Sequence, residues 1–273
     1  MTAQITADTK LSFHALSKAL SESDVPRTIT VPTDWRQGRT AYGGLTLGLS
    51  YQAARQDVPN LAPLRSVMIN FIGPVTGDPV FTSRILRQGR NVTTVEVEVK
   101  SEEAIVASTT FVFGASRESE LSVGFPAPDA PAPEACELFT PEFAKPFVPV
   151  FFHKFDTRLI AGKRPMSSAK EGYIRVWSRH TDVDSRDGLA SFLTLSDVLP
   201  PAALPMFNKM GPVSSVNFML NILVDNPKTQ DGWWHAETKL TSAQGGYASQ
   251  VMRFWNTDGV LVAEGMQSVA IFV

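Results

Sequence analysis

The feature that most constrains the fold of this chain is a pair of segments that occurs twice at a fixed distance. "QGRNVTTVEVEV" (88–99) is followed by "AIVASTTFVFG" (104–114), and "QGGYASQVMRFW" (244–255) is followed by "VLVAEGMQSVAIF" (260–272). Gln88 and Gln244 are 156 positions apart, and so are the starts of the "IVA" and "LVA" triplets within these segments. This repetition indicates two copies of one structural unit in tandem.

A proline-rich stretch separates the two copies. Residues 126–149 read "PAPDAPAPEACELFTPEFAKPFVP" and contain seven prolines. Proline lacks the backbone N–H that helices and sheet ladders need, so the stretch is predicted to be an extended connector. We therefore predict an N-terminal unit over residues 1–118, a linker over 119–150 and a C-terminal unit over 151–273.

Within each copy the pattern predicts a helix followed by an antiparallel meander. In the first copy, apolar or small residues at helical spacing predict a helix over 42–56, and strands are predicted at 65–73, 79–87, 91–101 and 104–114. In the second copy, a strand at 172–180 precedes a helix near 187–198, and strands follow at 214–224, 232–241, 246–256 and 260–272. The fold class predicted is α+β, with each sheet wrapped around a helix.

Composition excludes several classes of partner. The net charge is −2 and no basic block is present, so the sequence carries no footprint for nucleic acid or an anionic membrane surface. A single cysteine, Cys136, excludes an intramolecular disulfide, and the four histidines lack metal-ligand spacing. The first residues lack the pattern of a signal peptide and no run is apolar enough for a membrane helix, so the cytoplasm is the expected compartment.

Several blocks, in this order and spacing, resemble the bacterial acyl-CoA thioesterase II family. In the first half these are "AYGGLTLGLSYQAA", "LRSVMINFIGPV" and "IVASTTFVFG". In the second half they are "VWSR", "LSDVLPPAAL", "SSVNF" and "DGVLVAEGMQ". The resemblance covers nearly the whole chain outside the linker and the extreme N-terminus. It implies a double hotdog fold, and the hydrolysis of acyl-CoA thioesters without a metal or cofactor.

The resemblance also implies a set of catalytic residues in the second half. The family's Asp falls on Asp197, its Thr or Ser falls on Ser215, and its Gln falls on Gln267. Because Ser214 lies directly before Ser215, the sequence leaves open which of the two serines is the active hydroxyl.

The chemistry of these residue types agrees with this assignment. Asp197 lies in the apolar run "FLTLSDVLPPAALPMF", where burial would raise the pKa of its carboxyl towards neutrality and make it an effective general base. Ser and Gln side chains both donate and accept hydrogen bonds, so they can hold a water molecule in place. Without the resemblance, the sequence favours a simpler interpretation of Asp197, as a helix-associated carboxylate satisfied by neighbouring backbone.

The negative charge that develops on a thioester oxygen requires hydrogen-bond donors. The first turn of a helix leaves backbone N–H groups free, and glycine lets a ligand approach the backbone closely. We therefore expect Gly43 and Gly44, which open the first predicted helix, to bind the substrate while the second half supplies the general base.

Two alternatives to a thioesterase remain open at this stage. One is a hotdog enoyl-CoA hydratase, although that reaction typically uses an Asp/His pair and no His follows closely after Asp197. The other is a non-catalytic acyl-CoA binding protein that kept the fold and lost the chemistry. A homo-oligomer is expected in each case, because exposed sheet edges favour pairing.

Overall fold

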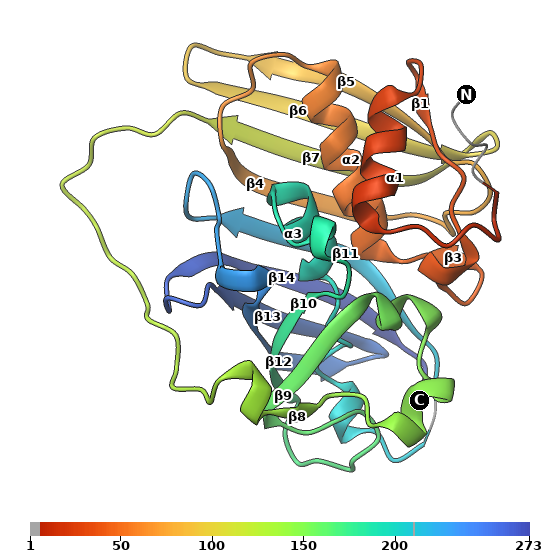
Figure 1. Cartoon of the computed structure of the whole chain (residues 1–273), viewed down its shortest axis with the longest axis vertical. Helices are drawn as coiled ribbons and strands as arrows, with labels where there is room; N and C mark the ends of the chain where they lie inside the picture. Colours follow the sequence, from red (N-terminus) through yellow and green to blue (C-terminus); the bar gives the residue numbers. More distant parts are fainter. Residues whose placement is uncertain (1–5, 210) are drawn as a thin grey trace.

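The computed structural model describes residues 6–209 and 211–273 (Figure 1). Residues 1–5, with which the predicted N-terminal unit begins, lie outside the described residues. The α-helices are α1 (Phe13–Glu22), α2 (Gly43–Asp57) and α3 (Leu189–Ser196). The strands are β1 (Arg27–Thr28), β2 (Arg36–Gln37), β3 (Thr40–Ala41), β4 (Leu64–Phe71), β5 (Val80–Gln88), β6 (Val92–Ser101), β7 (Ala104–Gly114), β8 (Glu137–Leu138), β9 (Phe155–Gly162), β10 (Tyr173–His180), β11 (Val213–Ile222), β12 (Trp234–Gln244), β13 (Tyr247–Trp255) and β14 (Leu261–Ile271). The 3-10 turns are η1 (Thr33–Trp35), η2 (Pro133–Ala135), η3 (Glu142–Phe147), η4 (Val150–Lys154), η5 (Val183–Ser185), η6 (Leu204–Met206) and η7 (Gln230–Gly232).

Twelve of the strands form one continuous antiparallel sheet, in the order β1-β5-β6-β7-β4-β11-β14-β13-β12-β10-β9-β8. The neighbouring strands β4 and β11, near the middle of this order, come from the two different copies, and Met68 of β4 lies opposite Met219 of β11. We call this β4–β11 pair the seam. Because backbone hydrogen bonds cross the seam, the two copies form one sheet rather than two separate ones (Figure 1).

The helices cover one face of this sheet and meet near the seam (Figure 1). Along α2 the side chains of Leu45, Leu47 and Leu49 are all buried, which explains why the helix shows little amphipathic pattern in the sequence. The helix α1 begins at a Ser12 cap, whose hydroxyl accepts the Ala15 N–H, and packs against α2. Because α2 packs against the sheet on one side and against α1 and α3 on the other, it lies at the centre of the hydrophobic core.

Most of the predicted elements are present. The helix predicted at 42–56 is α2, and the strands predicted at 104–114 and 172–180 are β7 and β10, within one residue at each end. The helix expected near 187–198 is shorter, because α3 ends at Ser196. Pro200 and Pro201 follow soon after and cannot continue a helix. The α+β class is confirmed.

The prediction of a purely extended linker is wrong in part. Residues 115–132 carry no helix or strand, but η2, β8, η3 and η4 follow between residues 133 and 154. Proline can start a 3-10 turn, where its missing N–H is not needed, and three of these turns begin at or just after a proline. The domain limits themselves remain a prediction.

Tryptophan side chains fasten the first part of the linker to the second copy. The indole N–H of Trp255 donates to the Phe125 carbonyl at 3.0 Å, and that of Trp177 donates to the Pro131 carbonyl at 2.9 Å. Cys136 is buried against Trp177 and Trp233. The long connection visible in Figure 1 is therefore attached where it reaches the second copy.

Candidate active site

Asp197 occupies the position that caps the C-terminal end of α3. Its carboxylate lies at the beginning of α2, the helix of the other copy. A Cβ atom built on Gly43 would be 2.6 Å from Asp197 Oδ2 and 2.9 Å from the ring of Phe71. Only glycine fits at position 43 without displacing the carboxylate, since real Cβ atoms do not approach an oxygen so closely. Asp197 and Gly43, predicted as catalytic and substrate-binding residues, are thus neighbours in space.

Gln267 joins Asp197 to Ser215. Its side-chain Nε2 donates to Asp197 Oδ1 at 3.1 Å and to Ser215 Oγ at 2.8 Å. Gln267 is 3% exposed on β14, on the buried face of the sheet, whereas Asp197 and Ser215 are partly exposed. The three side chains that the sequence predicts to be catalytic therefore lie together, although they are up to 70 residues apart in the chain.

A β-bulge in β11 decides which serine joins this group. Ser215 pairs with Val269, but Asn217 pairs with Ser268, so Val216 is an extra residue in the ladder. In a regular strand Ser215 and Phe218 would point to opposite faces, because side chains alternate. The extra residue turns Ser215 to the same face as Phe218 and leaves Ser214 exposed. The hydroxyl that contacts Gln267 belongs to Ser215.

Burial raises the pKa of the Asp197 carboxyl from an ordinary 3.8 to about 7. Removal from water is the largest cause, because it disfavours the charged form. The Gln267 side chain and the backbone N–H of Gly44 act in the opposite direction, since hydrogen-bond donors favour the carboxylate. The result is a carboxyl that exchanges its proton near neutral pH, as a general base requires.

Gln250 is a fourth member of the network that sequence reasoning missed. It lies on β13 directly opposite Gln267 on β14, and its Nε2 donates to Gln267 Oε1 at 2.8 Å. Its own Oε1 accepts the backbone N–H of Ala202 at 2.7 Å. A sequence signal was present, because Gln250 interrupts an alternating series of inward apolar residues (Ala248, Met252 and Phe254).

Tyr42 is an aromatic residue close enough to Asp197 to respond to its charge. Tyr42 precedes α2, stacks on Phe151 with ring centroids 4.0 Å apart, and donates its hydroxyl to the Thr194 carbonyl at 2.8 Å. Burial and the nearby charge of Asp197 raise the Tyr42 pKa well above 10. The Tyr42 hydroxyl is therefore uncharged at neutral pH, and the stacking and the hydrogen bond hold the side chain in place. Beyond it, α2 presents the backbone N–H groups of its first turn towards Asp197.

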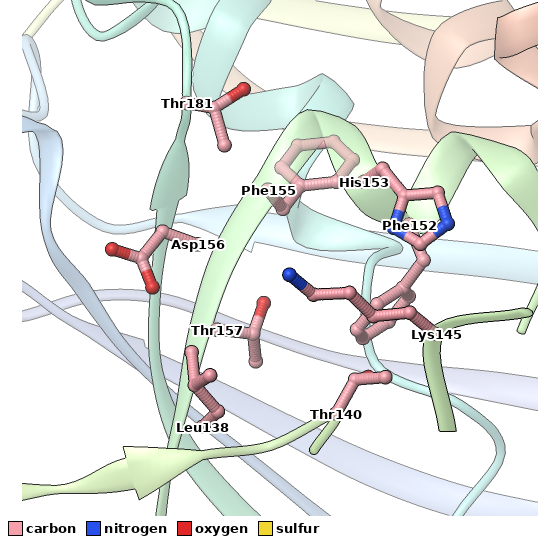
Figure 2. Close-up of a pocket in the computed structure, with 9 residues that line it drawn as sticks. All are labelled: Leu138, Thr140, Lys145, Phe152, His153, Phe155, Asp156, Thr157 and Thr181. Carbon is pink, nitrogen blue, oxygen red and sulfur yellow. The ribbon is translucent and has the colours of Figure 1, made fainter. Parts of the chain in front are cut away.

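Two surface cavities lie elsewhere, and neither is lined by Asp197, Ser215 or Gln267. Figure 2 shows the first, where Lys145 reaches towards Asp156 and Thr157 on β9. Its charged groups are compensated, since Lys145 pairs with Glu142 and Asp156 with Arg158. The second cavity is lined by residues from two segments, 224–230 and 256–262. Neither cavity contains a group of linked side chains like that of Asp197, Ser215 and Gln267.

Within residues 6–209 and 211–273, no three His, Cys, Asp or Glu side chains are grouped so that they could hold a metal ion. Over the same residues, no helix combines the length and apolar character needed to cross a membrane.

Two family models match the chain. The model described as the acyl-CoA thioesterase N-terminal domain matches residues 31–114, and the one described as the acyl-CoA thioesterase C-terminal domain matches residues 128–271. A search of curated proteins finds no match.

Solved structures share the fold along nearly the whole chain. A conserved protein of unknown function with a hot dog fold from Alicyclobacillus acidocaldarius is 20% identical, with a TM-score of 0.82 over 94% of this chain and 98% of its own. An acyl-CoA thioesterase II from Mycobacterium marinum is 18% identical, with a TM-score of 0.72 over 94% of this chain and 98% of its own. At such identities the likeness shows the fold alone, and it confirms the double hotdog.

Proposed function

The chain belongs to the bacterial double hotdog thioesterase family, and from this premise we propose that it hydrolyses acyl-CoA to a free acid and CoA through a water molecule directed by Asp197, Ser215 and Gln267. The thioester hydrolase activity follows from the family at a general level. The catalytic residues and the mechanism are our proposal.

One observation carries the proposal above all others. A single amide group, Nε2 of Gln267, contacts both Asp197 and Ser215 beside the first turn of α2. A general base, a hydroxyl and helix N–H groups are thereby gathered at one partly exposed point. These are the parts that attack by water on a thioester requires.

In the proposed first step, Asp197 accepts a proton from water as the water oxygen attacks the thioester carbonyl carbon. The hydroxyl of Ser215 is the second group that holds the water, because its oxygen already accepts a hydrogen bond from Gln267 and its own proton remains to be donated. Fixing the water between two groups lowers the entropic part of the barrier.

The oxyanion that forms is stabilised by backbone N–H groups at the start of α2, around Gly43 and Gly44. Donors at a helix N-terminus are already oriented, and the helix dipole favours negative charge there. When the intermediate collapses, the carbon–sulfur bond breaks and the proton held by Asp197 passes to the thiolate. The products are the acid and the CoA thiol, and Asp197 returns to its starting state.

The partners of this activity are predictions as well. Acyl-CoA is the substrate that the family indicates, and the mechanism above uses no cofactor. A cytoplasmic location remains a prediction. So does a homo-oligomer, although both edges of the sheet, β1 and β8, are two-residue strands that offer little backbone for edge pairing.

The test is the release of free thiol from acyl-CoA substrates of graded chain length. The proposal predicts release with at least one chain length, together with a stoichiometric amount of free acid. Binding of acyl-CoA without thiol release would instead support the non-catalytic binding protein. Addition of water to an enoyl-CoA with the thioester left intact would support the hydratase, and either result would overturn the proposal.

A further inference from the structure

Gln250 is fully buried, with 1% of its surface exposed, and both ends of its amide are occupied. Its Oε1 accepts from the Ala202 N–H at 2.7 Å, and its Nε2 donates to Gln267 Oε1 at 2.8 Å. An unbroken line of hydrogen bonds therefore runs from the backbone at Ala202, through two glutamine side chains, to Asp197 and Ser215.

The first donor in this line fixes the direction of all the others. A backbone N–H can only donate, so the Gln250 atom that faces Ala202 must be the oxygen. The NH₂ group of Gln250 then faces Gln267, and only the oxygen of Gln267 can accept from it. The NH₂ group of Gln267 is left to face Asp197 and Ser215. The two ends of an amide have nearly the same shape, so packing alone would not select this orientation.

We infer that Gln250 is a positioning residue, which holds the Gln267 amide with its NH₂ group towards Asp197 and Ser215. The geometric part of this inference stands without the proposed function, and its consequence for catalysis rests on that function.

The orientation matters because the opposite one would place an oxygen against a carboxylate. With Gln267 turned over, its Oε1 would face Asp197 Oδ1 and Ser215 Oγ, and two acceptors would meet at hydrogen-bond distance. The charged form of Asp197 would lose a donor, which raises its pKa further. Ser215 would have to donate its proton to Gln267, so that proton would no longer be available to the water.

The first test replaces Gln250 with methionine, which keeps an unbranched side chain of similar length and removes both hydrogen bonds. The titration of the Asp197 carboxyl is followed by carbon NMR in the folded protein. We expect its pKa to rise by about half a unit or more relative to the wild type. Tyr42, a titratable group whose pKa is raised by the nearby Asp197, stays neutral over this range.

The matched control is Thr238→Val on the neighbouring strand β12. Thr238 is also fully buried, and its hydroxyl has no hydrogen-bond partner among the described residues. Any general effect of disturbing this part of the core should be similar in both variants. An Asp197 pKa that shifts no more in Gln250→Met than in Thr238→Val would overturn the inference.

The second variant, Gln250→Glu, covers the case in which Gln250→Met does not fold. The carboxyl that it introduces, when protonated, can accept from Ala202 and donate to Gln267, as the amide of Gln250 does. The same carboxyl, when ionised, only accepts, so it turns the Gln267 NH₂ group away from Asp197. We expect kcat/KM of Gln250→Glu, divided by that of the wild type, to fall as the pH rises.

If kcat/KM of Gln250→Glu relative to that of the wild type stays constant between pH 5 and 9, the positioning role of Gln250 is overturned. Thr238→Val should keep a constant ratio close to one. If the wild type releases no thiol from any acyl-CoA, the proposed function fails. The NMR titration still decides the orientation of Gln267, so the two failures are distinguishable.

Discussion

Asp197 lies between the C-terminal end of α3 and the N-terminal turn of α2. It caps the C-terminal end of α3, and its side chain faces the N-terminal turn of α2, where N–H groups favour negative charge. Burial acts against that charge and is the larger effect, which leaves the pKa of the carboxyl at about 7. The carboxyl is thus partly ionised at neutral pH, and small changes around it will change its protonation.

The rate of thioester hydrolysis should follow the ionised fraction of Asp197. We expect kcat/KM to rise with pH, to reach half of its plateau near pH 7, and to fall about tenfold for each unit of pH below 6. The measurement is a pH profile of kcat/KM by loss of thioester absorbance. A flat profile between pH 5 and 9 would show that this carboxyl does not control the reaction.

Stability should also depend on Asp197, with a sign opposite to that of an ordinary paired carboxylate. The folded-state pKa, about 7, is above the ordinary 3.8, so the folded protein binds more protons than the unfolded chain between these values. The stabilisation is present below pH 3.8 and is lost as the pH rises towards 7, by at most about 1.4 kcal/mol per unit.

Asp197→Asn removes this titration. The free energy of unfolding of the wild type, measured with urea from pH 4.5 to 7.5, should therefore decrease relative to that of Asp197→Asn. Parallel curves for the two proteins would contradict a raised pKa at this position.

The sequence predicts Asp197 and Gln267 as catalytic residues only with the help of the family resemblance, which implies roles that spacing alone cannot give. Ser215 and Ser214 could not be separated, because the bulge at Val216 reverses the alternation of side chains and leaves no mark in the pattern. Gln250 could have been predicted as part of the network, since a buried amide among inward apolar residues needs hydrogen-bond partners. The sequence could not predict which end of the Gln250 amide faces Gln267, because this depends on the Ala202 N–H, which is distant in the chain.

The helices α2 and α3 approach each other closely through two glycines. A Cβ on Gly44 would overlap the backbone oxygen of Thr194, and a Cβ on Gly48 would overlap the Thr194 side chain. Because Asp197 caps α3 and Gly43 begins α2, this contact sets the distance between the proposed general base and the helix N–H groups. Packing between these elements therefore controls the geometry of the site.

Substitution at the two glycines should have different consequences. Gly44→Ala meets backbone that cannot move aside, whereas Gly48→Ala meets mainly the Thr194 hydroxyl. Each should cost about 1–3 kcal/mol in the free energy of unfolding. Thr194→Ala should recover part of the loss in Gly48→Ala but none in Gly44→Ala. Urea unfolding of the single and double variants measures this coupling, and equal recovery in both pairs would contradict the proposed contacts.

Elements with a strong local pattern could be predicted, and those fixed by distant contacts could not. The alternating residues of β6 and β7 place their apolar side chains inward as the sequence indicates. The strand β9 was not predicted, because it follows a proline-rich stretch and has only two buried side chains, Phe155 and Thr157. The helix α1 had a usable signal in Ser12 followed by Phe13, Leu16 and Leu20.

At the scale of the whole molecule, the site exists because two copies share one sheet. The first copy supplies Gly43 and Gly44, and the second supplies Asp197, Ser215 and Gln267. The β4–β11 ladder and the contact between α2 and α3 join them across the seam. The internal duplication predicted two similar units, but the pairing of β4 with β11 depends on contacts between residues that are distant in the chain, such as Met68 and Met219.

The linker should not be needed to hold the halves together. A protease site inserted after Leu121, which is 79% exposed, precedes the part of the linker fastened by Trp255 and Trp177. After cleavage we expect the two pieces to elute together in size-exclusion chromatography, with thioesterase activity close to that of the uncut protein. Separation of the pieces without denaturant would show that the seam alone is too weak.

The most direct measurement of the central claim is thiol release by Asp197→Asn with the best acyl-CoA substrate. If Asp197 is the general base, this variant keeps the circular dichroism spectrum of the wild type and its kcat falls by about 100-fold or more, which is the contribution expected of a general base. A folded Asp197→Asn protein that releases thiol at the wild-type rate would show that Asp197 is not the general base.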